Sequence, residues 1–168
     1  MSLLMVGTLL ASSLAPEVSG AGRAAHQPEQ PAAGPGGRDY PYDAVAQRRV
    51  GSSPAGAYVF TPDDPAVVDK PLPLVIFVHG ITAVNPDLYG EWIEHLVRRG
   101  ATVVYPDYQT ANPLAGTQRA YFGDMMAGIR AALVTLDTRA DGPVVVVGHS
   151  MGGILAVNYA ARAEDAGF

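Results

Sequence analysis

Residues 143–153 read Pro-Val-Val-Val-Val-Gly-His-Ser-Met-Gly-Gly, and no other stretch of the chain restricts its architecture as strongly. The four consecutive valines are typical of a parallel strand that is buried on both faces. The run ends in the pattern Gly-x-Ser-x-Gly. From Met151 to about residue 163, apolar residues then recur at the spacing of one face of a helix. The sequence therefore predicts a strand, a tight turn at Ser150 and a helix in immediate succession.

Similar strand–helix units precede this one in the chain. The predicted strands lie at 57–61, 73–78 and 101–105, and the predicted helices at about 89–97 and 117–138. Strands that alternate with helices indicate a parallel sheet with helices on both faces. Ligands in such sheets bind beyond the carboxyl ends of the strands, so we expect any chemistry in the loops at that edge. These loops are 79–87, 106–116 and 148–151.

The first of these helices carries end signals of its own. Asn85 followed by Pro86 is typical of an N-cap residue with proline in the first turn. Gly100 suits the position just past the C-terminus of the helix. Glu94 and Arg98 have the spacing of an i,i+4 ion pair on its surface.

The turn predicted at Ser150 suits nucleophilic chemistry. A serine on a strained strand-to-helix turn projects its hydroxyl clear of the sheet. Gly148 and Gly152 lack Cβ atoms, so the strand and the helix can approach each other closely around that turn. The helix N-terminus behind Ser150 offers free N–H groups and a positive dipole end to a developing oxyanion.

Two motifs in this order resemble α/β-hydrolases of the serine esterase and lipase type. The first is Val-Ile-Phe-Val-His-Gly at 75–80, similar to the His-Gly that closes the third strand in that family, and the second is the pattern at 148–153. Tyr-Pro-Asp-Tyr at 105–108 falls where the family's fourth strand ends. The resemblance implies an α/β fold class: a partial α/β-hydrolase fold, mostly parallel sheet with flanking helices, that ends after the helix following Ser150.

The resemblance also implies roles for individual residues. Ser150 is the nucleophile, and acyl transfer to water passes through an acyl-enzyme on its hydroxyl. The backbone N–H groups of Met151 and Ile81 are the oxyanion donors, with Thr82 as the alternative if the loop is displaced by one residue. Thr82 and Tyr108 are expected to line a pocket. The other motif residues are His79, Gly80, Gly148, His149, Gly152 and Gly153. The resemblance implies no cofactor and no metal.

The histidines raise the question of the general base. The family's triad follows the chain order Ser, Asp or Glu, and then His, yet the 18 residues after Ser150 (168 − 150) include no histidine. We expect His79 to organise its loop, His149 to pack or hydrogen-bond locally, and His95 to be a solvated helix residue. The chain is therefore predicted to be the N-terminal part of a hydrolase, without its acid and base, and inactive or nearly so toward esters. Its valine strand would lie at or near the edge of the sheet.

Three classes of function stay open at this stage. The first is a hydrolase of carboxylic esters, with small-molecule, lipid or polyester substrates. The second is another enzyme on the same fold, an amidase or peptidase or a cofactor-free haloperoxidase. The third is a non-catalytic binding module that resembles a hydrolase. A coding continuation with an acid and then a histidine would favour the first two classes, and a genuine stop codon would favour the third.

The overall composition restricts partners and chemistry. Lys and Arg number 11 against 16 Asp and Glu, which gives a formal net charge of −5 and a pI of about 5.2. A nucleic-acid binder that relies on phosphate neutralisation is therefore not expected. The absence of cysteine excludes disulfides, cysteine-ligated metals and a cysteine nucleophile. The oligomeric state stays open.

The N-terminal third differs in composition from the rest. Residues 1–22 begin with an apolar run that has the length of a signal peptide and is too short to span a membrane. No basic residue precedes Arg23, so the alternative is a disordered extension. The signal peptide implies a secreted or periplasmic protein, and the alternative location is cytoplasmic. Residues 23–54 are predicted as a Pro/Gly-rich linker or extension, and 55–168 as the N-terminal part of an α/β-hydrolase domain.

Overall fold

The computed structural model describes residues 28–34, 36–67, 71–110, 112, 118–136, 143–162 and 164. The chain divides into two compact units, 1–30 and 31–168, and the fold belongs to the second unit. The predicted signal peptide at 1–22 lies outside the described residues. No helix in the described part of the chain has both the length and the apolar character needed to cross a membrane.

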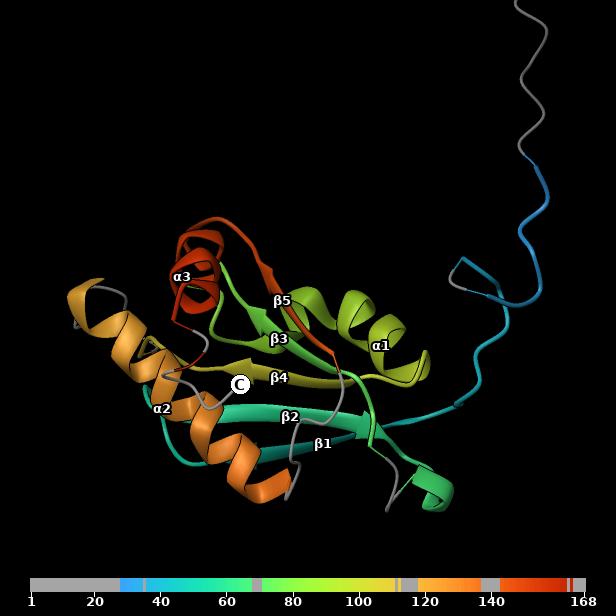
Figure 1. Ribbon diagram of the computed structural model, residues 1–168, viewed down its shortest axis with the longest axis horizontal. Helices are drawn as coiled ribbons and strands as arrows, with labels where there is room; N and C mark the ends of the chain where they lie inside the picture. The colour runs from blue at the N-terminus through green and yellow to red at the C-terminus, as the bar shows by residue number, and fades with distance from the viewer. Residues whose placement is uncertain are drawn as a thin grey trace, which may run out of the picture. The chain divides into compact units, whose positions relative to one another are not determined.

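A five-stranded sheet forms the centre of the second unit, in the order β1-β2-β4-β3-β5 (Figure 1). The strands are β1 (Val45–Val50), β2 (Ala57–Pro62), β3 (Leu74–Val78), β4 (Thr102–Pro106) and β5 (Val144–Gly148). Strand β3 pairs in parallel with β4 and with β5, whereas β2 runs antiparallel to both β1 and β4. The predicted mostly parallel sheet is confirmed.

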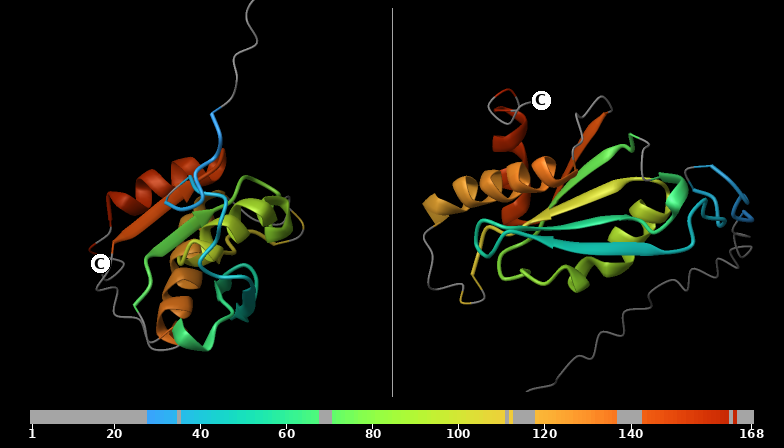
Figure 2. Two further views of the ribbon diagram at one scale, coloured as in Figure 1. Left: turned by 90° about the vertical axis from the view of Figure 1, so that its right-hand side faces the viewer. Right: turned by 90° about the horizontal axis from the view of Figure 1, so that it is seen from below.

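Helices cover both faces of this sheet, as Figure 2 shows. The helical segments are η1 (Pro65–Val67), η2 (Pro86–Tyr89), α1 (Gly90–Arg98), α2 (Gln118–Leu136) and α3 (Met151–Ala160). Residues of α2 and α3 pack on one face with Ile76 and Val78, and residues of α1 pack on the other face with Val75 and Phe77. Because alternate residues of β3 serve the two faces, all five of its residues are buried and its sequence is apolar throughout.

The continuous segment made of η2 and α1 begins and ends at the residues that the sequence predicted. The Asn85 side chain accepts a hydrogen bond from the Asp87 N–H, and Pro86 opens the turn behind it. Gly100 has a φ of 95°, a left-handed conformation that glycine adopts without steric cost. Glu94 and Arg98 form the expected ion pair, with 3.0 Å between nitrogen and oxygen.

The sheet begins twelve residues earlier than the first strand that the sequence predicted (57 − 45). β1 lies inside the segment expected to be a linker, and it pairs along its whole length with β2. The sequence did not predict β1 because Gln47, Arg48 and Arg49 interrupt the apolar pattern. An edge strand tolerates these residues, since it needs only one apolar face. The guanidinium group of Arg49 lies over the Tyr58 ring, 4.4 Å from its centroid, in a cation–π contact.

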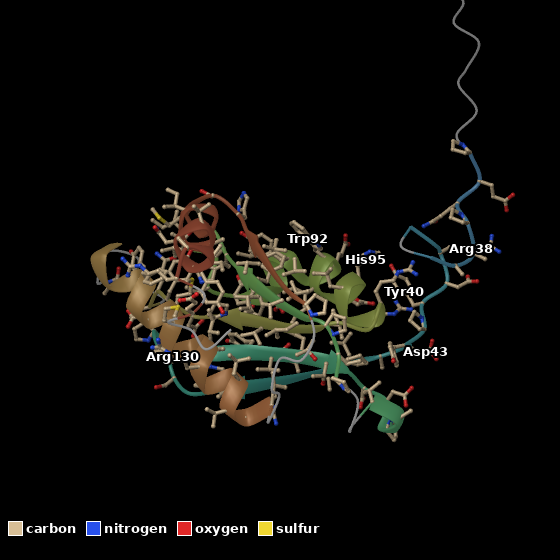
Figure 3. The ribbon with its side chains drawn as sticks, viewed as in Figure 1. Arg38, Tyr40, Asp43, Trp92, His95 and Arg130 are labelled. Atoms are coloured by element: carbon tan, nitrogen blue, oxygen red, sulfur yellow. The ribbon has the colours of Figure 1, made fainter. Side chains whose placement is uncertain are left out.

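The residues before β1 pack against α1 as well. The Tyr40 side chain lies beside His95 (Figure 3), with its hydroxyl 2.9 Å from His95 Nδ1. The guanidinium groups of Arg98 and Arg99 stack on the Tyr40 ring. Arg99 also donates hydrogen bonds to backbone carbonyls of Gly34, Gly37 and Asp39. The expectation of a purely solvated His95 is therefore wrong, because an aromatic side chain from the predicted linker reaches it.

The valine strand β5 lies at the edge of the sheet, as predicted, with β3 as its neighbour. Val145 on this strand is 49% exposed. Two apolar residues of the adjoining helix α3, Ile154 and Val157, are 61% and 71% exposed. The described residues thus leave an apolar surface uncovered beside β5.

Two glycines in α2 provide a test of how closely this helix packs against the β1–β2 turn. A Cβ atom at Gly128 would lie 2.2 Å from the carbonyl oxygen of Gly56 in the β1–β2 turn, whereas a Cβ at Gly123 would meet nothing within 4 Å. We expect Gly128→Ala to lower the free energy of unfolding by about 1–3 kcal/mol, because the helix must move away from the turn. Gly123→Ala should raise it by up to about 1 kcal/mol, because alanine favours the helix. Urea unfolding measures both values, and equal effects at the two positions would contradict this account.

Candidate functional site

The site is built where two parallel strands end side by side. β3 and β5 pair in register, with Val78 opposite Gly148, and the N–H of His149 continues the ladder by donating to the Val78 carbonyl at 3.1 Å. The loop that starts at His79 therefore leaves the sheet beside the turn that contains Ser150. This edge is where ligands bind in open α/β sheets.

Ser150 occupies a strained turn between β5 and α3. Its φ is 53° and its ψ is −120°, a conformation that L residues rarely adopt and that costs on the order of 1–3 kcal/mol. Its side chain makes no capping hydrogen bond to the helix that follows, and the residue is exposed in the described part of the chain. The hydroxyl is thus presented to solvent at the edge of the sheet.

The glycines of this motif are required by close backbone contacts. A Cβ atom at Gly148 would lie 2.4 Å from the carbonyl oxygen of Gly152. A Cβ at Gly152 would lie 2.1 Å from the carbonyl oxygen of Val78 and 2.3 Å from that of His79. A Cβ at Gly153 would meet only ordinary contacts, at 3.6 Å and beyond. The first two glycines therefore allow the helix to start directly against the end of β3.

Several amide groups of the loop after β3 are occupied by hydrogen bonds. The Gly80 N–H donates to the Tyr89 hydroxyl oxygen at 3.0 Å, and the Thr82 N–H donates to Gln109 Oε1 at 2.8 Å. The Ala83 N–H donates to the Gly80 carbonyl at 3.1 Å. Among the described residues, the Ile81 N–H finds no acceptor, and neither does the Met151 N–H at the start of α3.

The direction of the Ile81 N–H follows from the peptide group to which it belongs. The carbonyl of Gly80 accepts hydrogen bonds from His79 Nδ1 at 2.6 Å and from the Ala83 N–H. In a trans peptide the N–H points opposite to the carbonyl. The Ile81 N–H is therefore turned away from the His79 ring. Thr82, with a φ of 68°, completes this turn.

The N–H of Thr82, the alternative donor expected from the sequence, is engaged by a side chain that sequence reasoning missed. Gln109 lies in the loop after β4, is 2% exposed, and accepts the Thr82 N–H. Its own backbone carbonyl accepts a hydrogen bond from the Ser53 hydroxyl in the β1–β2 turn. Nothing in the local pattern around Gln109 marks it, because its partners lie 27 and 56 residues away in the chain.

His79 is fully buried beneath this loop. Its ring stacks on Tyr108, with 4.1 Å between ring centroids, and on Tyr105 at 5.1 Å. Burial lowers the pKa of His79, against smaller opposing effects from its hydrogen bond to Gly80 and from the charge of Asp107. The ring is therefore neutral near pH 7 and donates its Nδ1 proton to the loop, which agrees with the expected organising role.

Tyr108 does not line an open pocket in the described structure. Its side chain is fully buried and its hydroxyl donates to the carbonyl of His79. The expectation of a pocket wall is corrected here, because the ring is covered by His79 on one side and packs near Tyr121 at 5.5 Å. Burial raises the pKa of the Tyr108 hydroxyl far above its ordinary value, so it stays protonated and keeps donating.

His149 makes a contact that is not local. Its Nδ1 lies 2.8 Å from the hydroxyl of Tyr89, 60 residues earlier in the chain. Sequence reasoning placed Tyr89 on the apolar face of a helix and gave it no further role. Among the described residues, no group of three or more His, Asp or Glu side chains could hold a metal ion.

The strained backbone at Ser150 predicts an unusual order of stability between two variants. Both Ser150→Ala and Ser150→Gly remove the hydroxyl, but only glycine relieves the positive φ. We expect the glycine variant to be more stable than the alanine variant by about 1 kcal/mol in urea unfolding. The same pair of substitutions at Ser52, whose φ is not positive, should not show this preference. An alanine variant at least as stable as the glycine variant at Ser150 would contradict the strain.

The buried His79 predicts a dependence of stability on pH. Because its pKa in the folded state lies below the ordinary value of 6.5, the unfolded chain binds more protons as the pH falls below that value. The free energy of unfolding should therefore decrease from pH 7 toward pH 5. His79→Asn keeps an N–H donor for Gly80 but does not titrate, so urea unfolding should show a weaker pH dependence for this variant. An equal pH dependence in both proteins would contradict a neutral buried ring.

Comparison with known proteins places this geometry in a family. The sequence model described as the alpha/beta hydrolase fold matches residues 73–166, which is 94 of 168 residues (166 − 73 + 1). Lipase LipV of Mycobacterium tuberculosis is 51% identical over 39 residues, which is 23% of this chain and 15% of LipV.

Solved structures of esterases have a similar fold. A bacterial heroin esterase superposes with a TM-score of 0.57 at 22% identity, over 78% of this chain and 43% of the esterase. An esterase of Pyrobaculum calidifontis superposes with a TM-score of 0.51 at 27% identity, over 76% of this chain and 42% of the esterase. The chain thus spans less than half the length of each esterase. The family match over more than half of its residues, together with this fold, shows that the chain belongs to the α/β-hydrolase fold family.

Proposed function

We propose that this chain carries the nucleophile and the oxyanion donors of a serine hydrolase that cleaves carboxylic esters. The observation that carries the proposal is the exposed Ser150, held at a φ of 53° between β5 and α3 next to an unoccupied N–H at Met151. A protein gains no stability from such backbone strain, and strain of this kind is concentrated at functional sites. The printed names of the relatives, a lipase and two esterases, agree with ester hydrolysis.

The reaction proceeds in two steps. The Ser150 oxygen attacks the ester carbonyl carbon, its proton passes to a base, and the alcohol leaves with a proton, so that an acyl-enzyme remains. Water then attacks the acyl group, and the carboxylic acid and the free serine hydroxyl are formed. In both steps the carbonyl oxygen becomes negatively charged, and the N–H groups of Ile81 and Met151 are proposed to donate to it.

The free N–H groups support this assignment of the oxyanion donors. The amides of Gly80, Thr82 and Ala83 are already engaged. Among the described residues, the N–H groups of Ile81, Val84 and Asn85 in this loop have no acceptor, and Ile81 is the one that directly follows Gly80. Fixed donors need no reorganisation when charge develops, and this is why such sites stabilise the transition state. The expected substrate is an ester of a small molecule, a lipid or a polyester.

The general base is not assigned to any histidine that the structure describes. His79 is buried and donates its Nδ1 proton to Gly80, and His95 is hydrogen-bonded to Tyr40. His149 Nδ1 is bonded to Tyr89. Ester turnover by this chain alone is therefore expected to be slow, since removal of triad members costs about 10⁴- to 10⁶-fold in rate.

A covalent probe tests the nucleophile without requiring turnover. The purified 168-residue chain is incubated for hours with a fluorophosphonate, and the adduct is measured by intact mass and peptide mapping. We expect one slow adduct on Ser150, none in Ser150→Ala, and unchanged labelling in Ser52→Ala, a control at another exposed serine. Labelling that persists in Ser150→Ala, or no labelling of the wild-type chain, would overturn the proposed function.

A further inference from the structure

The hydroxyl of Tyr89 connects the two halves of the candidate site. Tyr89 ends η2, just before α1. Its oxygen accepts the Gly80 N–H at 3.0 Å and lies 2.8 Å from His149 Nδ1. Gly80 belongs to the loop after β3, and His149 belongs to the turn after β5. One phenolic oxygen therefore holds together two segments that are almost 70 residues apart (149 − 80 = 69).

The two hydrogen bonds of this oxygen differ in their donors. The Gly80 N–H donates to the phenol oxygen. In the bond to His149, either the hydroxyl donates to Nδ1 or an Nδ1–H donates to the oxygen, depending on the tautomer of the ring. The Tyr89 oxygen bridges Gly80 and His149 in both cases.

The contact is close, and packing fixes the ring that makes it. A Cβ atom at Gly80 would lie 2.9 Å from His149 Nδ1 and 3.3 Å from the Tyr89 hydroxyl oxygen, so a larger residue there would displace the His149 ring from this contact. The Tyr89 ring packs against Phe77 at 5.0 Å between centroids and against Tyr105 at 6.2 Å. These contacts hold the ring without its hydroxyl, so the hydroxyl has a role separable from packing.

We infer that Tyr89 is a positioning residue for the proposed ester hydrolysis, an inference that rests on the proposed function. Ile81 directly follows Gly80, and Met151 lies two residues after His149. The Gly80–Tyr89–His149 bridge therefore sets the distance between the two proposed oxyanion donors. Tyr89 acts through these segments and does not itself touch the substrate. An oxyanion hole loses efficiency when its donors are displaced by a fraction of an ångström to an ångström.

The test compares two tyrosine–histidine pairs in the full 168-residue chain. Tyr89→Phe removes the bridging hydroxyl, and Tyr40→Phe removes a hydroxyl that makes a similar 2.9 Å bond to His95 away from the site. We expect fluorophosphonate labelling of Ser150 to slow about fivefold to tenfold in Tyr89→Phe, the factor associated with one neutral hydrogen bond. Labelling of Tyr40→Phe should match that of the wild-type chain, and circular dichroism should be unchanged in both variants.

Two further readouts separate positioning from packing. The ¹⁵N spectrum of His149 should lose the signature of a hydrogen bond at Nδ1 in Tyr89→Phe. His149→Ala removes an exposed side chain and should slow labelling by a similar factor. The double variant Tyr89→Phe/His149→Ala should then label as fast as His149→Ala alone, because both changes break the same bridge.

The outcomes distinguish this inference from the function on which it rests. If the wild-type chain is not labelled at Ser150, the proposed function fails and this inference fails with it. If the wild-type chain is labelled and Tyr89→Phe is labelled equally fast, the positioning role alone is overturned. Additive effects in the double variant would also overturn it, since they would indicate that Tyr89 acts independently of His149.

Discussion

The parallel pairing of β3 with β5 is the constraint on which the rest of the site depends. Their register sets Val78 opposite Gly148, and the His149 N–H extends the ladder by one hydrogen bond beyond the strands. Because parallel strands end at the same edge, this register places the loop at His79 beside the turn at Ser150. A shift of one residue would reverse the faces of every valine in β5 and separate the two segments.

Close backbone approach then converts this register into a rigid site. α3 starts so near the end of β3 that a single methyl group at Gly152 would overlap two carbonyl oxygens. The turn at Ser150 has a positive φ, which an L residue adopts at a cost in free energy. The strain is offset by the buried sheet on one side and by the packing of α3 on the other. The proposed function gives a reason for a serine at this strained position, because it requires an exposed hydroxyl there.

Polar side chains from distant segments hold the loop after β3 in place. His79 and Ala83 fix the Gly80 carbonyl, Gln109 holds the Thr82 N–H, and Tyr89 holds the Gly80 N–H. Each of these hydrogen bonds removes a donor or an acceptor from competition with a ligand. Among the described residues the amide of Ile81 has no acceptor, and it is the donor that the family resemblance had implied. In the proposed function, the occupied groups on either side of Ile81 hold this donor in place.

The sequence was sufficient for the elements whose signals are local. Continuous apolar runs specified the strands β3, β4 and β5. The expected burial of β5 on both faces is wrong, because β5 lies at the edge of the sheet and none of its residues is fully buried. Asn85, Pro86 and Gly100 specified the limits of a helix, and the glycines around Ser150 specified a tight turn. It was insufficient for β1, whose exposed edge tolerates charge, and for Tyr40, whose partner is 55 residues away. Gln109, Tyr89 and the burial of Tyr108 also emerged only from the folded chain. Hydrogen bonds between loops leave no periodic trace in a sequence, because they depend on which strand ends lie side by side, and the order of strands in the sheet decides that.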